Sequence, residues 1–397
     1  MEANIILFDD WRRENLLPLT FTRPVADLRV GILTIKEKWE RALNSPCYFL
    51  TQKYLSEKFE LPMQNGACIL INGGVLPSSE LVKAIQNLGI NEALVTENSI
   101  IAGRISSLPN VGYIPVLADF VKLQTYSNEI VEIVHPWHIF SLNGAEINRD
   151  FNLLTANRKS QPLSSTNTLL NAENVFVEEG AIVECAILNG NTGPIYIGKN
   201  AEIMEGSIVR GPFALCDHST LKIGAKIYGP TTIGPHSKVG GEVNNCVIYG
   251  CTNKAHDGFI GNSVIGEWCN LGADTNTSNL KNNYAQVKLW SYPKHSFIDT
   301  GLQFCGLVMG DHSKCGINTM FNTGTVVGVS ANIFGDGFPR NFIPSFSWGG
   351  AQGFTTYKID KALETAEIVM GRRGIPLSDI DKEILTKIYN QSEGLHK

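Results

Sequence analysis

Aliphatic side chains recur at every sixth residue through the middle of this chain. The first run has no interruption and consists of Ile197, Ile203, Val209, Leu215, Leu221, Ile227, Ile233 and Val239. A second run follows after a break, at Met309, Cys315, Phe321, Val327 and Ile333. A six-residue period is typical of a parallel β-helix, in which short strands turn corners around a shared apolar core. We therefore predict a solenoid, because a β-sandwich would show eight such positions in succession only by chance.

Composition limits the remaining possibilities. A chain of 397 residues with a hydrophobic fraction of 43% is expected to form two or more domains. Its formal charge of -5 offers no basic field for nucleic acid. It contains no apolar run of membrane-spanning length, and its first residues lack the basic start of a secretory signal. Nine cysteines without a CxxC pair favour reduced thiols in a cytoplasmic protein.

Residues 1–165 differ from the repeat in their pattern. Short apolar runs such as Ile5–Phe8 and Ala67–Ile71 alternate with segments of helical period, for example Gly31–Leu43 and a helix opening at Ser78 or Ser79. This alternation predicts a parallel sheet of Rossmann type. Ligands bind such sheets at the carboxyl ends of the strands. Arg12 and Arg13 follow the first strand and Arg23 is close in sequence, so these arginines are candidates for holding nucleotide phosphates; a solvated loop is the alternative.

The predicted boundary between the domains is a polar connection within residues 145–170. The solenoid is then expected over residues 171–344, with an excursion between Asn276 and Leu307. Loops that leave a regular solenoid commonly carry function. Residues 345–397 contain two helical segments, about Ile359–Gly371 and Pro376–Tyr389, which are expected to cap the open end of the solenoid.

One segment of the repeat is specific enough to indicate a family. It runs from Asn253 to Asn279 and contains Lys254-Ala255-His256, Ile265-Gly266 and Asn270-Leu271-Gly272-Ala273; Gly310-Asp311-His312 follows later. This segment resembles the acetyltransferase half of the GlmU family, the bifunctional enzymes that make UDP-N-acetylglucosamine. The opening of the chain, with Arg23-Pro24 and Leu28-Arg29, looks most like an alternate bacterial branch of that family. The resemblance implies a Rossmann-like nucleotidyltransferase-type α/β domain, a left-handed hexapeptide β-helix and C-terminal helices.

The same resemblance implies roles for individual residues. His256 would be the general base that takes a proton from an amino sugar as it attacks acetyl-CoA, and Glu242 would orient it. Asn270 would contact the sugar, and Ala273, Asn279 and Gly316 would line the acetyl-CoA cleft. Three sugar-phosphate positions depart from the family pattern: a tyrosine is Phe259, a lysine is Asn244 and an arginine is Lys226. Substitute phosphate ligands could come from the excursion, which offers Lys281, Lys288 and Lys294.

The nucleotidyltransferase half departs further. The family's glycine-rich loop is replaced by Asp10-Trp11-Arg12-Arg13-Glu14, and its two metal aspartates fall in Gly73-Gly74-Val75 and Pro136-Trp137-His138. Nucleotidyl transfer needs Mg²⁺ to neutralise charge on the nucleoside triphosphate. This activity is therefore left open, and no metal ligand is assigned, although Asp9, Asp10 or Asp119 could serve.

Three interpretations follow. The first is a sugar-phosphate acetyltransferase, acting as a homotrimer on glucosamine 1-phosphate or a related amino sugar phosphate. The second is a regulatory protein that binds nucleotide sugars through a degenerate first domain. The third is a solenoid carbonic anhydrase, for which His218, His236, His256, His295 and His312 would have to supply a zinc site, although their spacing matches no ligand pattern.

Overall fold

The structure is a computed structural model that describes residues 3–62, 66–97, 99–107 and 109–393. The first domain contains one six-stranded sheet in the order β2-β1-β3-β5-β4-β6. Its strands are β1 (Asn4–Phe8), β2 (Cys47–Leu50), β3 (Cys68–Asn72), β4 (Glu92–Val95), β5 (Ile100–Ile105) and β6 (Lys122–Thr125). The sheet is mixed rather than parallel throughout, because β5 runs antiparallel to both β3 and β4. The backbone of Thr96 donates a hydrogen bond to the carbonyl of Ser99 between β4 and β5, whereas a parallel pair would need a crossover helix between its strands.

Capping residues set the helix starts in this domain. Helix α2 (Ile35–Leu43) begins after Thr34, which forms a capping box with Glu37. Helix α3 (Ser79–Gln86) begins after Ser78, whose side chain accepts a hydrogen bond from the backbone of Leu81. The short helical segments are α1 (Arg12–Asn15), η1 (Leu19–Phe21), η2 (Val25–Asp27), η3 (Lys53–Leu55) and η4 (Leu117–Asp119).

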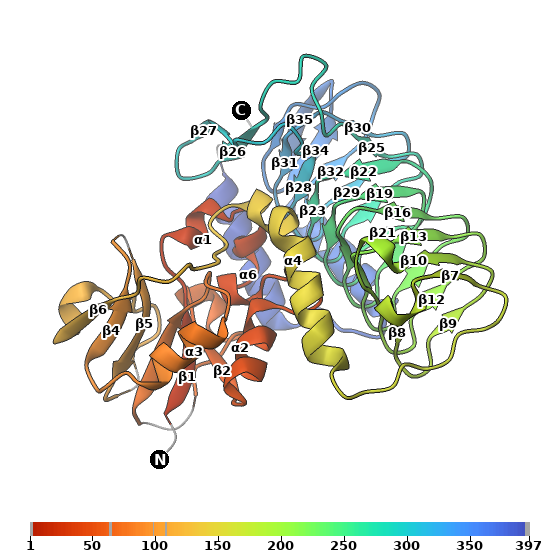
Figure 1. The fold of residues 1–397 in the computed structure, drawn as a ribbon. Helices are drawn as coiled ribbons and strands as arrows, with labels where there is room; N and C mark the ends of the chain where they lie inside the picture. Colours follow the sequence, from red (N-terminus) through yellow and green to blue (C-terminus); the bar gives the residue numbers. More distant parts are fainter. Residues whose placement is uncertain (1–2, 63–65, 98, 108, 394–397) are drawn as a thin grey trace.

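Helix α4 (Pro136–Thr155) joins the two domains. Residues 148–150, which were predicted to belong to a polar connection, are part of this helix. Its polar residues are buried with partners. The ammonium of Lys38 is 2.9 Å from Glu146 and 2.5 Å from Asp150, so the buried charges compensate one another. Asn143 accepts a hydrogen bond from the backbone of Gly31 and donates one to the carbonyl of Pro230 in the solenoid. Figure 1 shows α4 between the first domain and the solenoid.

The solenoid is a parallel β-helix of three sheets. Sheet I contains β7 (Thr168–Leu170), β10 (Ile187–Asn189), β13 (Ile208–Arg210), β16 (Lys226–Tyr228), β19 (Glu242–Asn244) and β22 (Phe259–Gly261), and the pair β25 (Asn276–Thr277) and β30 (Met320–Phe321) follows it. Sheet II contains β8 (Val175–Val177), β11 (Ile195–Ile197), β14 (Phe213–Leu215), β17 (Thr231–Ile233), β20 (Val247–Ile248), β23 (Val264–Ile265), β28 (Leu307–Met309), β31 (Thr325–Val327) and β33 (Phe342–Ile343).

Sheet III is the third side of the β-helix, so the three sheets together form a prism. It contains β9 (Ile182–Val183), β12 (Glu202–Ile203), β15 (Thr220–Leu221), β18 (Lys238–Val239), β21 (Asn253–Lys254), β24 (Asn270–Leu271), β29 (Lys314–Cys315), β32 (Asn332–Ile333) and β34 (Ser347–Gly350), with β35 (Gly353–Thr356) antiparallel at its end. Every residue of the two six-residue runs is buried in this prism, so the predicted core is confirmed. The α/β first domain, the β-helix and the C-terminal helices together confirm the predicted fold class.

The three sheets differ in what covers them. Strands of sheet II, such as Thr231–Ile233, are buried at every position, whereas sheet I strands such as Ile208–Arg210 alternate exposed and buried. The outer face of sheet II is covered by α4 and by the first domain, which shares one apolar cluster with Val247, Tyr249 and Val308. Sheet I therefore keeps an open outer face, including the exposed Ile187 and Ile208, which are paired in register.

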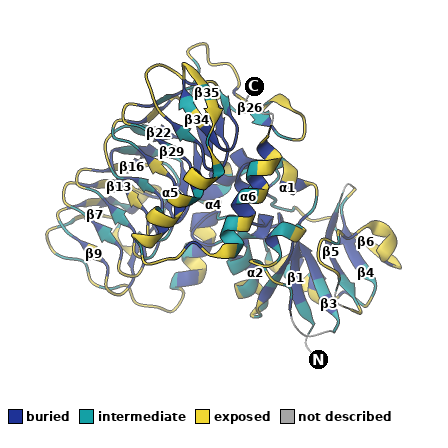
Figure 2. Cartoon of the chain, turned by 180° about the vertical axis from the view of Figure 1, so that it is seen from behind, coloured by how far each residue is buried: buried dark blue, intermediate teal, exposed yellow. Residues whose placement is uncertain are grey.

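The excursion and the C-terminal helices occupy the flanks. Residues between β25 and β28 form the hairpin of β26 (Lys288–Ser291) and β27 (Ser296–Asp299). Helices α5 (Ile359–Gly371) and α6 (Asp379–Ser392) were predicted to cap the open end of the solenoid, but they do not. They pack along the corners between sheets II and III, against Trp268 and Phe346, and Arg373 donates a hydrogen bond to the carbonyl of His236. Figure 2 shows both helices with an exposed outer side. Residues 394–397 of the predicted last segment lie outside the described range.

Candidate active site

His256 lies at a corner of the prism, in the turn between β21 and β22, and is exposed. We call the column of corners that join sheet III to sheet I the His256 edge; it comprises residues 240–241, 255–258, 272–275 and 316–319. The column is continuous. The backbone of Asp274 donates to the carbonyl of Asp257, and Asn318 donates to the carbonyl of Ala273. Since neighbouring strands of a sheet are about 4.8 Å apart, His256 and Ala273 lie one rung apart.

A buried lysine supports the corner that carries His256. Lys254 pairs with Val239 in the ladder and points into the apolar core, where it is 2% exposed. Its ammonium donates hydrogen bonds to the carbonyl of His256 at 2.6 Å and to that of Asp257 at 3.2 Å. Burial lowers the Lys254 pKa to about 8, and Asp257 and Asp274 partly oppose this shift. Lys254 thus ties the His256 corner to the interior.

The predicted orienting carboxylate lies one rung from His256. Glu242 starts strand β19 and pairs with Phe259, and its backbone donates to the carbonyl of Gly258. Its carboxylate accepts a hydrogen bond from the hydroxyl of Tyr228 at 2.5 Å. Within the described part of the chain no hydrogen bond joins Glu242 to His256. Glu242 and His256 therefore lie in neighbouring rungs of the β-helix, but the predicted interaction between them is not present.

The other predicted residues divide into two groups. Those close to the His256 edge are Lys226, Phe259 and Asn270 on the adjoining strands, and Ala273 and Gly316 on the edge itself. Asn244 and Asn279 lie at the opposite side of sheet I. Asn244 ends β19, and the side chain of Asn279 donates to that of Asn262 at the corner between β22 and β23. The structure therefore does not bring these two asparagines to His256.

Small residues surround His256 on its edge of the prism. Gly240, Gly241, Gly272 and Ala273 flank the His256 corner, so small residues lie on both sides of the imidazole. Gly272 packs tightly on Gly316, since a Cβ on Gly272 would lie 2.4 Å from the Gly316 carbonyl carbon. Ile317 on the same edge is exposed, and so is Phe334, which lies next to Gly316 in the following turn. Ala273 and Gly316, two of the three residues expected to line an acetyl-CoA cleft, therefore lie on the same edge as His256.

The three arginines predicted to bind nucleotide are buried and already have partners. Arg12 pairs with Asp10 and Glu132. Arg13 donates to the hydroxyl of Tyr54 and to the carbonyl of Thr20, and it pairs with Glu14. Arg23 pairs with Asp27, Glu267 and Asp311, of which the last two belong to the solenoid. Arg23 therefore connects the two domains instead of presenting its guanidinium to a ligand.

The crevice between the carboxyl ends of β1 and β3 is occupied by the chain itself. A Cβ on Gly74 would lie 2.9 Å from the Cδ of Arg12, so the arginine stem fills the space beside this glycine. The carboxylate of Asp10 accepts hydrogen bonds from Arg12 and Asn72. Asp9 accepts from Thr51 and from the backbone of Val25, while burial raises its pKa to about 6. These carboxylates are engaged within the domain, so they do not form an open Mg²⁺ site.

Asp119 is also engaged, because it accepts hydrogen bonds from Tyr113 and the backbone of Val116. Among the described residues, no group of three or more histidine, cysteine, aspartate or glutamate side chains is arranged for a metal ion. Of the five solenoid histidines considered for zinc, His218 and His236 stack on one another with ring centroids 4.9 Å apart. His312 stacks on Trp268 instead.

Sequence reasoning missed two features of the site. Lys254 belongs to the recognised motif, but its inward orientation follows from its register with Val239, which requires the strand pairing. A charged residue at an inward position of a six-residue period is a signal that could have revealed it. Tyr228, the partner of Glu242, lies in the adjacent turn fourteen residues earlier and left no sequence signal.

Comparisons with known proteins agree with this architecture. A family model described as sugar nucleotidyl transferase matches residues 5–159. A bifunctional sugar-1-phosphate nucleotidylyltransferase/acetyltransferase of Sulfurisphaera tokodaii is 25% identical over 281 residues, 70% of this chain and 60% of that protein. The bifunctional protein GlmU of Methanococcus maripaludis (strain C5) is 27% identical over 215 residues, 54% of this chain and 44% of that protein. A putative uncharacterized acetyltransferase YaiX of Escherichia coli K12 is 25% identical over 162 residues, 40% of this chain and 70% of that protein.

The chain spans about half the length of the GlmU proteins that it matches. None of the helices in the described residues is long and apolar enough to cross a bilayer. The similarity to the family model covers the first domain, and the hexapeptide period and the three-sheet prism account for the remainder. The chain is therefore similar to GlmU-type proteins: a segment that matches the sugar nucleotidyl transferase model precedes a β-helix with the hexapeptide period.

Proposed function

We propose that the β-helix transfers an acetyl group from acetyl-CoA to the amino group of an amino sugar phosphate. The observation that carries this proposal is the His256 edge, where an exposed imidazole stands on a lysine-anchored corner between small residues. Acetyl-CoA supplies an activated thioester. An imidazole nitrogen of His256 accepts a proton from the attacking amine, and the same proton is then available to the departing thiol. One N–C bond forms and one C–S bond breaks.

The charged residues near His256 support a phosphorylated acceptor. Lys226 is exposed two rungs from Phe259 on sheet I, and an ammonium is a common phosphate ligand. Phe259 lies along the outer face of the same sheet, since a Cβ on Gly261 would meet its ring at 2.6 Å. An amino sugar 1-phosphate, with glucosamine 1-phosphate as the first candidate, combines a nucleophilic amine with an anionic group for Lys226.

For the first domain we propose binding rather than nucleotidyl transfer. The specific observation is that Arg12 fills the crevice between β1 and β3 and that Asp9 and Asp10 are engaged inside the domain. A nucleoside triphosphate with Mg²⁺ would need open carboxylates at this position. A homotrimer is the proposed assembly, and the open outer face of sheet I, with Ile187 and Ile208, supports it. Nine unpaired cysteines favour a cytoplasmic location.

Two assays on the full-length protein test these proposals. The first follows free thiol release from acetyl-CoA with glucosamine 1-phosphate and a panel of other amino sugar phosphates. The second follows pyrophosphate release from UTP and N-acetylglucosamine 1-phosphate with Mg²⁺. We expect acceptor-dependent thiol release and no pyrophosphate release. Absence of thiol release with every acceptor contradicts the acetyltransferase, and pyrophosphate release contradicts the binding role of the first domain.

A further inference from the structure

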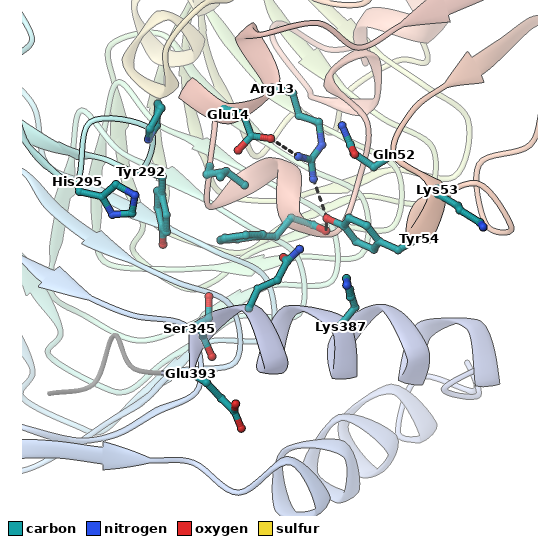
Figure 3. A pocket seen from close by; sticks show the side chains of 15 residues that line it. Arg13, Glu14, Gln52, Lys53, Tyr54, Tyr292, His295, Ser345, Lys387 and Glu393 are labelled. Carbon is teal, nitrogen blue, oxygen red and sulfur yellow. Dashed lines mark hydrogen bonds and ion pairs between the residues drawn. The ribbon is translucent and has the colours of Figure 1, made fainter. Parts of the chain in front are cut away.

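A cavity of about 850 Å³ lies where the first domain, the β26–β27 hairpin and helix α6 meet (Figure 3). The first domain contributes Arg13, Phe21, Lys53 and Tyr54. The hairpin contributes Tyr292 and His295, and α6 and the residue after it contribute Lys387 and Glu393. None of the lining residues belongs to the His256 edge, so the cavity is separate from the proposed acetyltransferase site.

The walls of the cavity are held in place by aromatic and hydrogen-bond contacts. Tyr292 contacts Phe21 edge to face, with ring centroids 5.3 Å apart, and contacts Phe342 in the same way at 5.5 Å. The hydroxyl of Tyr54 donates to the carbonyl of Phe21 at 2.6 Å and accepts a hydrogen bond from Arg13 at 2.7 Å. The hairpin is thereby fixed against the first domain, and a preformed cavity of this kind is typical of small-molecule sites.

The cavity carries cationic side chains that have no protein partner. In the described part of the chain, the side chains of Lys53, His295 and Lys387 make no hydrogen bond or ion pair. Figure 3 shows them apart from one another, with His295 and Lys53 at opposite sides and Lys387 on the helix between them. Arg13 and Glu14 neutralise one another. The remaining charged side chains that line the cavity are Lys53, Lys387 and Glu393, so the cavity carries a net positive charge.

We propose that this cavity binds a nucleoside diphosphate group, such as that of a sugar nucleotide. Cations on separate sides suit an extended anion better than a single phosphate ion. Phe21, Tyr54 and Tyr292 offer aromatic surfaces for a base or a sugar ring, and aromatic stacking on bases is tolerant of base identity. The volume lies within the range of cofactor-sized sites, roughly 300–1,000 Å³. Because its walls come from both domains, a bound ligand connects the hairpin and α6 to the first domain.

This proposal does not depend on acetyl transfer by His256. Isothermal titration calorimetry of the full-length protein tests it with UDP, ADP and inorganic phosphate as separate ligands. The variant Lys53→Gln/Lys387→Gln removes two exposed charges from the cavity. The matched control is Lys83→Gln/Lys199→Gln, which removes two exposed charges elsewhere. Lysine–phosphate contacts are charge-assisted, so their loss is expected to weaken binding at least tenfold.

The expected result is binding of UDP or ADP below about 1 mM, weakened at least tenfold in the cavity variant and less than twofold in the control. The two nucleotides distinguish a uridine from an adenosine ligand. Tyr292→Leu is expected to weaken nucleotide binding without affecting inorganic phosphate. The proposal is overturned if neither nucleotide binds, if the cavity variant binds like the control, or if inorganic phosphate binds as tightly as the nucleotides. Thiol release measured on the same variants is expected to stay within twofold of the wild type, which separates this site from that of His256.

Discussion

The ammonium of Lys254, buried in the apolar core of the β-helix, donates a 2.6 Å hydrogen bond to the carbonyl oxygen of His256. It also bonds the next carbonyl, that of Asp257. Lys254 points into the core at a position where its neighbour in the adjacent strand is the aliphatic Val239. Burial of its ammonium would cost free energy of folding if these hydrogen bonds were absent. This pair links the interior of the prism to the one exposed imidazole of the proposed site.

Loss of this anchor is expected to impair acetyl transfer without removing the base. Lys254→Met keeps the length of the side chain and abolishes both hydrogen bonds, so the His256 corner is no longer fixed. We expect thiol release to fall about tenfold or more, since misplacement of a catalytic group by about 1 Å costs up to 10²-fold. Lys238→Met is the control, because Lys238 is the exposed neighbour one rung away in sheet III. Equal rates for the wild type and Lys254→Met would refute the positioning role.

Lys254 also predicts a pH dependence of stability. Its folded pKa, about 8, lies below the ordinary value of 10.5. Between these values the unfolded chain binds a proton that the folded chain has lost, so this residue makes the free energy of unfolding rise with pH, by up to about 1.4 kcal/mol per unit. Urea denaturation between pH 7.5 and 10 measures the difference between the wild type and Lys254→Met. We expect that difference to shift in favour of the wild type as pH increases; parallel profiles would contradict the assignment.

His312 predicts an effect of the same sense at acidic pH, where stability again rises with pH. Burial, assisted by nearby Lys314, lowers its pKa to about 3 from the ordinary 6.5. Between pH 6.5 and 3, His312 is protonated in the unfolded chain but not in the folded chain, so the free energy of unfolding decreases as pH falls. In His312→Gln, which cannot titrate, this loss should be smaller by up to about 1.4 kcal/mol per pH unit. Thermal denaturation from pH 7 to 5 tests it, with His218→Gln as an exposed-histidine control.

The ion pair between Arg23 and Asp311 is expected to stabilise the contact between the domains. The two side chains are buried, 2.5 Å apart, and Thr22 donates to the same carboxylate. Arg23→Met leaves the Asp311 charge without its main partner, which typically costs about 3–5 kcal/mol. The second change Asp311→Asn should recover part of that loss. A double-mutant cycle by urea denaturation measures the coupling, and additive effects would show that the pair contributes nothing.

The sequence predicts those parts of the fold that depend on local repetition. Ile197 through Val239 determine the solenoid because each inward position accepts only a small range of apolar volumes. Helix α3 is predicted by Ser78, because capping is decided within four residues. The antiparallel direction of β5 was not predicted, although residues 96–99 are too short a connection for a parallel crossover, which needs about a dozen residues or more.

Of the residues predicted for the site, His256, Ala273 and Gly316 belong to the family motif and also lie on the His256 edge. Arg12 and Arg23 looked like phosphate ligands because their partners, Glu132 and Asp311, are 120 and 288 residues away in the chain. Residues 148–150 looked like a polar linker because the partner of Asp150 is Lys38, 112 residues earlier. Charged residues that are satisfied by distant partners have the same sequence appearance as residues that face a ligand.

The role of His256 as general base is tested by comparing thiol release from acetyl-CoA by the wild type, His256→Ala and His218→Ala, each shown to be folded by its thermal transition. His218 is an exposed corner histidine on the same solenoid, away from the His256 edge. Removal of a general base typically costs 10²–10⁴-fold. We expect a loss of at least 10²-fold for His256→Ala with every active acceptor, and an unchanged rate for His218→Ala. A His256→Ala protein that still releases thiol at the wild-type rate would contradict it.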